Sequence, residues 1–242
     1  MKKVLTILLT QVLIATGLYA QTQQDLCDSV SIISEQLQLH PKNIELLMKK
    51  AALNIELEKW EAALEDYSTV LDIQPSNLTA LHFRAFVNQH LDRYAFARAD
   101  YEKVLMYEPR HLPSLMGLVL TNCADGHTTE AYDGANRLVE MFPESACAYD
   151  VRSDVEQKLN LTTAAIDDIE KAIELEEESM KRRKVSRLSF DDDMVSYQMH
   201  AFMLYLDEGN KSKAKNRLQY LADKGIPKAA LADYYKMLQT KR

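Results

Sequence analysis

The chain has 242 residues, of which 47% are hydrophobic and 27% are charged, and its formal net charge is −7. This composition is ordinary for a soluble globular protein, and the mild acidity makes it a poor candidate for general nucleic-acid binding, which requires a basic face. With only six glycines and six prolines the chain has few turns, so its long stretches rich in Ala, Leu, Glu, Lys and Gln should be helices.

Residues 1–20 have the features of a secretory signal peptide. Lys2 and Lys3 form a basic start, residues 4–17 are largely apolar, and Ala20 supplies the small residue before a polar run. The apolar stretch is shorter than the ~20 residues of a membrane-spanning helix, so we expect no stable membrane span after cleavage. A retained membrane anchor is the alternative. A short signal with no cysteine directly after Ala20 indicates an exported bacterial protein, periplasmic or secreted.

Four prolines spaced 34 residues apart organise the chain that follows: Pro41, Pro75, Pro109 and Pro143. A fixed period of this length predicts one supersecondary unit repeated head to tail. We number each repeat from the third residue after its proline, which gives four repeats at 44–77, 78–111, 112–145 and 146–179.

Each repeat has the pattern of two helices joined by a short turn. Apolar residues recur at helical spacing in both halves, and the proline at position 32 falls just past the second helix, where it blocks continuation. Position 20 is alanine in every repeat, and a small side chain at a crossing lets two antiparallel helices approach closely. These alanines are Ala63, Ala97, Ala131 and Ala165.

These residues closely resemble the tetratricopeptide repeat, a 34-residue helix-turn-helix with a large residue at position 4, small residues at 8 and 20, an aromatic at 24 and proline at 32. Position 24 is Tyr67 and Tyr101 in the first two repeats, and position 4 is large in all four. The resemblance covers residues 44–179. It implies an all-α fold, an α-α superhelix that forms a right-handed solenoid of antiparallel helix pairs.

The sequence departs from the family at position 11, which is usually aromatic. Here the position holds Asn54, Asn88 and Asn122, and then Glu156. A polar row shared by neighbouring helices is one interpretation of this series.

The flanking segments extend the array. Residues 21–43 match the end of a second helix and predict an N-terminal capping half-repeat. Residues 195–242 predict a fifth repeat-like helix pair, joined at Gly209 with Ala214 as its small residue, and a C-terminal capping helix. Between them lies a charged insertion, residues 180–194. It is either a solvated connector or a basic patch for an anionic partner.

The resemblance implies a concave groove lined by the first helices through positions 2, 5, 9, 12 and 13. Its early part should be apolar and its later part acidic, which suits an extended peptide or a helix with an apolar segment and a basic one. The alternative is that these residues cover each other or are closed over by the half-repeat. The expected groove residues are Met48, Ile55, His82, Phe86, Gln89, His90, Met116, Leu120, Asp150 and Asp154.

The sequence therefore predicts a non-enzymatic scaffold that binds a protein or peptide partner, with an envelope-associated complex as one setting. It carries no catalytic signature, and we expect no catalytic residues, no metal and no cofactor. His82 and His90 lie about 12 Å apart along a helix, too far for one metal ion. A carbohydrate-uptake accessory protein is an alternative function. A less favoured one is an enzyme using Asp150 and Asp154 as paired carboxylates.

Overall fold

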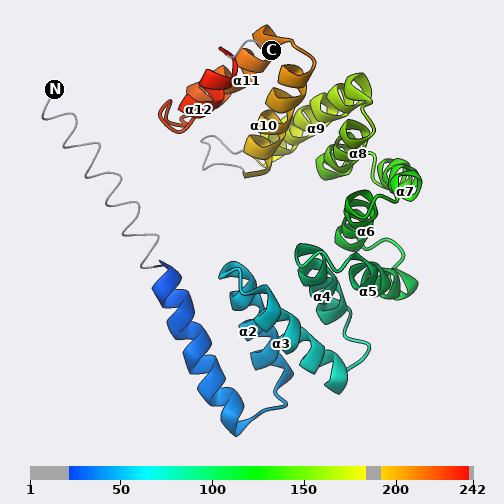
Figure 1. The fold of residues 1–242 in the computed structure, drawn as a ribbon, viewed down its shortest axis with the longest axis vertical. Coiled ribbons are helices and arrows are strands. Elements are labelled where there is room, and N and C mark those ends of the chain that lie inside the picture. Colours follow the sequence, from blue (N-terminus) through cyan, green and yellow to red (C-terminus); the bar gives the residue numbers. More distant parts are fainter. Residues whose placement is uncertain (1–21, 184–191, 240–242) are drawn as a thin grey trace, which may run out of the picture. The chain divides into compact units, whose positions relative to one another are not determined.

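The computed structural model describes residues 22–183 and 192–239, and every regular element within them is a helix. The predicted signal peptide and the middle of the charged insertion lie outside these residues. The chain divides into two compact units, Met1–Pro109 and Arg110–Arg242. Within each unit, consecutive helices pack beside one another in pairs (Figure 1). The all-α prediction is thereby confirmed.

The N-terminal unit starts with a helix over residues 22–39, whose Leu37 packs against the core of the next two repeats. The first helices of both repeats begin at an asparagine: the side chain of Asn43 accepts a hydrogen bond from the Leu46 N–H, and Asn77 does so from Ala80. Such caps satisfy a donor that the helix leaves open. The repeat helices are α2 (Ile44–Glu56), α3 (Trp60–Ile73), α4 (Leu78–His90) and α5 (Tyr94–Tyr107).

The C-terminal unit continues the same pairing with α6 (Leu112–Ala124), α7 (Thr128–Met141), α8 (Ala146–Lys158), α9 (Thr162–Arg182), α10 (Asp192–Asp207), α11 (Lys211–Asp223) and α12 (Ala232–Met237). Helix α9 has 21 residues, because Glu177 stands where a proline ends the other second helices. The charged insertion therefore begins as a continuation of α9. The last helix, α12, has six residues. The chain before it makes a tight turn in which the Ala230 N–H bonds to the Pro227 carbonyl.

The turn between the two helices of every pair uses the same backbone conformation. Position 15 has a left-handed φ in all five pairs, at Glu58 (55°), Asp92 (56°), Gly126 (82°), Asn160 (62°) and Gly209 (85°). The next N–H then bonds back to the carbonyl of position 11, as a helix-ending turn requires. Three of the five turns adopt this conformation without glycine.

The alanines at position 20 lie where the two helices of each pair meet. Each of the four is 0% exposed, and Ala214 of the fifth pair is 0% exposed as well. Their burial shows that the 34-residue register assigns helix crossings correctly throughout the array.

Candidate functional site

In the N-terminal unit, two of the expected groove residues meet the only tryptophan of the chain. The His90 ring stacks on Trp60 with centroids 4.2 Å apart and planes 3° apart. Phe86 meets both of these rings edge-on, at 4.5 Å from His90 and 6.2 Å from Trp60. We call these three residues the aromatic cluster. His90 is exposed and the other two are half-buried, so the cluster presents part of its surface to solvent.

Two further expected groove residues are partly engaged by their neighbours. The Tyr101 hydroxyl donates to Gln89 Oε1 at 3.3 Å, and the His82 ring lies 5.2 Å from Phe83 and 5.7 Å from Tyr101. Burial of the Tyr101 hydroxyl raises its pKa far above the ordinary value, so it stays a donor. Gln89 and His82 are therefore partly covered by Phe83 and Tyr101, which lie outside the expected groove set.

The remaining apolar groove residues all pack at the edges of the two hydrophobic cores. Met48 and Ile55 rest against the core of the N-terminal unit, and Met116 and Leu120 rest against that of α6, α7 and α8. All four are half-buried. The structure thus leaves part of each side chain open while its other part stabilises the repeat.

In the C-terminal unit, the two expected acidic groove residues meet a histidine of the next helix pair. His200 Nδ1 lies 2.8 Å from Asp150 Oδ1, and His200 Nε2 lies 3.5 Å from Asp154 Oδ1. The side chain of His200 is 13% exposed, whereas that of Asp154 is 47% exposed. His200 was not predicted, because groove residues were expected only in the four regular repeats and His200 lies in the fifth helix pair.

Two of these groups, Asp154 and His200, have raised pKa values. Burial raises the pKa of Asp154 to about 6, against the opposing effect of His200. Burial disfavours the charged imidazole of His200, but the hydrogen bond with Asp150 and the nearby carboxylates outweigh it and raise its pKa. Both groups therefore hold protons in the folded protein at a higher pH than usual.

Three of the repeats contain a partly buried polar row: a basic residue at position 7, a polar residue at 11 and an aspartate at 23. In the first repeat Asp66 accepts from Lys50 Nζ at 2.7 Å and from Asn54 Nδ2 at 3.1 Å. In the second, Arg84 and Asp100 form a two-pronged pair at 2.7 and 2.8 Å. The hydrogen bond to Asp66 therefore explains why position 11 of the first repeat is an asparagine.

The fourth repeat repeats this row with one change. Arg152 pairs with Asp168 through two contacts of 2.5 and 2.8 Å, but position 11 is Glu156, which is 4% exposed. Burial raises the pKa of Glu156 to about 7, and the nearby Asp168 contributes to the increase. A protonated Glu156 can donate to a carboxylate as an asparagine amide does.

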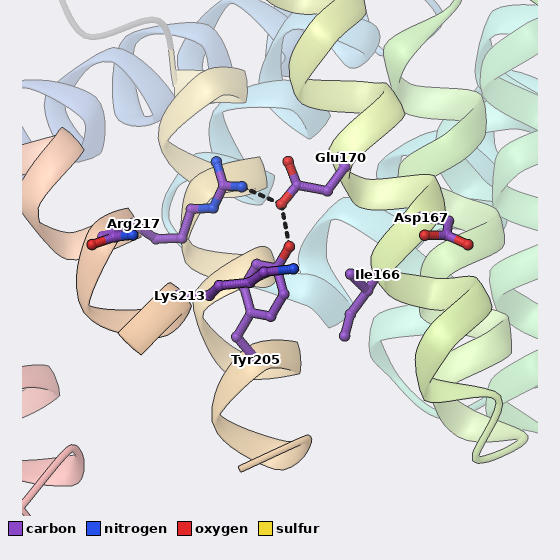
Figure 2. Close-up of a pocket in the computed structure, with 7 residues that line it drawn as sticks. Ile166, Asp167, Glu170, Tyr205, Lys213 and Arg217 are labelled. Atoms are coloured by element: carbon purple, nitrogen blue, oxygen red, sulfur yellow. Dashed lines mark hydrogen bonds and ion pairs between the residues drawn. The ribbon is translucent and has the colours of Figure 1, made fainter. Parts of the chain in front are cut away.

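The fifth helix pair does not contain this row, since its position 7 is Ala201. Arg217 stands at position 23, where the other rows have an acid, and it pairs with Glu170 of the preceding repeat. Glu170 also accepts a hydrogen bond from the Tyr205 hydroxyl, at 2.6 Å (Figure 2). Both residues line a cavity of about 490 Å³. Lys213 and Arg217 project from α11 on one side of this cavity, and Ile166 and Asp167 project from α9 on the other.

The described residues provide no group of three potential metal ligands close enough to hold an ion. None of the helices in residues 22–183 and 192–239 is long and apolar enough to cross a membrane. The three cysteines, Cys27, Cys123 and Cys147, carry free thiols.

No family model matches the chain, and no curated protein matches it. Solved structures do. A tetratricopeptide repeat protein from Parabacteroides merdae superposes with a TM-score of 0.71 at 22% identity, over 91% of this chain and 80% of that one. A thermophilic tetratricopeptide repeat protein from Thermus thermophilus gives a TM-score of 0.66 at 17% identity, over 81% and 98%.

PilW, a widely conserved type IV pilus biogenesis factor, gives a TM-score of 0.65 at 18% identity, over 89% of this chain and 90% of that one. These three likenesses establish that the chain has the helical-repeat fold of tetratricopeptide repeat proteins, an α-α superhelix. The resemblance seen in the sequence is thereby confirmed at the level of the fold.

Proposed function

We propose that this chain, built on a tetratricopeptide-like fold, is a non-enzymatic scaffold that binds a polypeptide segment along the first helices of its repeats. The fold supports the general role, since stacked helix pairs present extended surfaces with little chemistry of their own. Of its structural neighbours, PilW is described as a biogenesis factor. This is consistent with an assembly role.

The observation that carries the proposal is the aromatic cluster. Trp60, Phe86 and His90 hold each other rigidly and remain partly open to solvent. Rigid aromatic side chains cost little conformational entropy when they are covered, and such residues dominate the binding energy of many interfaces. Met48 and Ile55 continue the apolar surface on the preceding first helix.

A basic group of the partner would meet the acidic residues of the C-terminal unit. Asp150 is already bonded to His200, so the half-exposed Asp154 is the carboxylate available to an incoming cation. We therefore expect a partner segment with large apolar side chains in one part and a lysine or arginine in another. The predicted export of the protein places such a partner outside the cytoplasm.

Site-specific photocrosslinking tests the groove. A benzoyl-phenylalanine introduced at position 86 should trap a discrete partner in cells, whereas the same group at Glu102, which is exposed on α5, should not. Sequencing the N-terminus of the mature protein from the same cells tests the predicted cleavage after Ala20. Equal crosslinking from both positions would contradict the groove assignment.

A further inference from the structure

The third repeat keeps only the middle residue of the polar row, the buried Asn122, and lacks both charged ends. Its position 7 is Leu118 and its position 23 is Gly134, where the other three repeats have a basic residue and an aspartate. The apolar side chain of Leu118 and a glycine without a side chain therefore stand where the other repeats have an ion pair. The space between α6 and α7 therefore differs in chemistry from the equivalent space in its neighbours.

The absence of a side chain at Gly134 is part of how these helices pack. A Cβ atom built at this position would lie 2.9 Å from Val119 Cγ2, too close for ordinary contact. The other repeats have Ala51, Ala85 or Ser153 at the position of Val119. Val119 therefore fits only because position 134 is a glycine. The equivalent residues of the second repeat are Ala85 and Asp100.

The result is a cavity of about 260 Å³ lined by α6 and α7, all within the C-terminal unit. Its walls include Leu115, Leu118, Val119, Leu138 and Met141. An apolar cavity of about 150 Å³ already accepts a molecule the size of benzene. The cavity therefore has room for one large aliphatic or aromatic side chain.

The rim of this cavity is charged. Glu130 and Asp133 carry exposed carboxylates, and Arg137 lies one turn beyond them on the same helix. With two carboxylates and one guanidinium, the rim carries a net negative charge. His127 Nδ1 lies 3.8 Å from Glu130, while an arginine or lysine beside the inserted side chain would reach Asp133.

We propose that this cavity is a second binding site, which takes one large apolar side chain of a partner polypeptide that carries a basic residue next to it. The site goes beyond the groove, because it lies between the two helices of one repeat. It rests on the proposed function only in that its ligand is a polypeptide. Leucine followed by arginine is the simplest ligand with both features.

Methyl NMR on the full chain tests the proposal with three capped dipeptides as probes. N-acetyl-Leu-Arg-amide should shift the methyl signals of Leu115, Leu138 and Met141 saturably at millimolar concentration. N-acetyl-Ala-Arg-amide and N-acetyl-Leu-Glu-amide should bind at least fivefold more weakly, because one lacks the apolar side chain and the other the positive charge. Equal binding of all three probes, or no saturable shift with the first, would overturn the proposal.

Two variants locate the binding. Replacing Leu118→Arg, Val119→Ala and Gly134→Asp together gives the third repeat the residues of the second, which fold there as a buried pair. This variant should lose binding of the Leu-Arg probe at least tenfold. If it fails to fold, Glu130→Lys with Asp133→Lys leaves the helix packing untouched and should reverse the preference between the Arg and Glu probes. An unchanged preference would refute the role of the rim.

The two proposals fail separately. Phe86→Ala should leave binding of the Leu-Arg probe unchanged, and the triple variant should leave photocrosslinking from position 86 unchanged. Loss of probe binding on Phe86→Ala would mean that the probe reports the groove and would overturn the second site. If the chain self-associates and the triple variant does not, the cavity is occupied by a second copy of the chain and the dipeptide assignment is wrong.

Discussion

The second and third repeats share one backbone plan but fill it differently. Both have helices of 13 and 14 residues, a left-handed residue in the turn and a fully buried alanine at the crossing, Ala97 or Ala131. Between their helices, however, the second repeat holds the Arg84–Asp100 pair, and the third holds Leu118, Gly134 and an open cavity.

This difference separates positions that the fold requires from positions that it only permits. The turn and the crossing alanine recur in all five pairs, because the turn ends the first helix and a small side chain lets the two helices approach closely. The polar row fills a space between the helices that the third repeat lines with apolar side chains and leaves partly open. Functional differences between repeats should therefore be sought at positions 7, 11 and 23.

The largest effect should come from breaking what the two repeats share. Replacing Ala97→Asp, or Ala131→Asp, puts a carboxylate at a crossing where the alanine is 0% exposed. We expect a loss of more than about 4 kcal/mol, because a buried unpaired charge is very costly. Urea unfolding followed by circular dichroism measures the change. Ala99→Asp, on the exposed side of α5, is the control and should stay within about 0.5 kcal/mol of the original protein.

A smaller effect should come from breaking the ion pair that the second repeat has and the third lacks. Asp100→Ala leaves the Arg84 guanidinium without its two contacts, and the Arg84 side chain is 27% exposed. We expect a loss of about 2–3 kcal/mol, less than for a fully buried pair because solvent reaches the arginine. The same urea titration applies.

The matched control is the exposed pair of the same unit, Arg93 with Glu61, whose side chains are 41% and 66% exposed. Glu61→Ala should cost less than about 0.5 kcal/mol. A similar cost for both substitutions would mean that the polar row contributes no more than a surface contact, and the comparison of the two repeats would lose its energetic basis.

The sequence predicted the shared features well, for a physical reason. Periodic positions such as Pro75 or Ala97 act locally, on a helix end or a crossing, so their spacing alone reveals them. The aromatic cluster and the meeting of His200 with Asp150 depend on which neighbour each side chain reaches. The tryptophan at the first position of α3 was visible, but its stacking on His90 required the packing of two repeats.

The cavity in the third repeat likewise could not be predicted from the sequence alone. Leu118 and Gly134 are plain in the sequence, and their departure from the basic and acidic residues of the other repeats can be read by aligning the four registers. What the alignment does not give is that positions 7 and 23 face each other across the helix pair. The ion pairs between Arg84 and Asp100 and between Arg152 and Asp168 show that these two positions lie opposite each other.

The smallest effect should come from a change that keeps the polar row of the fourth repeat but removes the ionisation of Glu156. The pKa of Glu156 is about 7 in the folded protein, against an ordinary value of 4.5. The folded state therefore binds more protons than the unfolded state between these values, so stability should fall as the pH rises through this window and level off above it. The raised pKa values of Asp154 and His200 act with the same sign.

Glu156→Gln removes the ionisation while it keeps a side chain that can donate to Asp168. At about pH 3.5 the variant and the original protein should melt together, because Glu156 is then protonated in both the folded and the unfolded state. At pH 8 the variant should be more stable by about 1–2 kcal/mol, or about 2–6 °C in Tm, as shown by melts at both pH values. Glu140→Gln, at an exposed position of α7, should change neither melt. A variant less stable than the original at pH 8 would mean that Glu156 is ionised and paired in the folded state. The fourth repeat would then hold a salt-bridge network where the first holds a neutral amide.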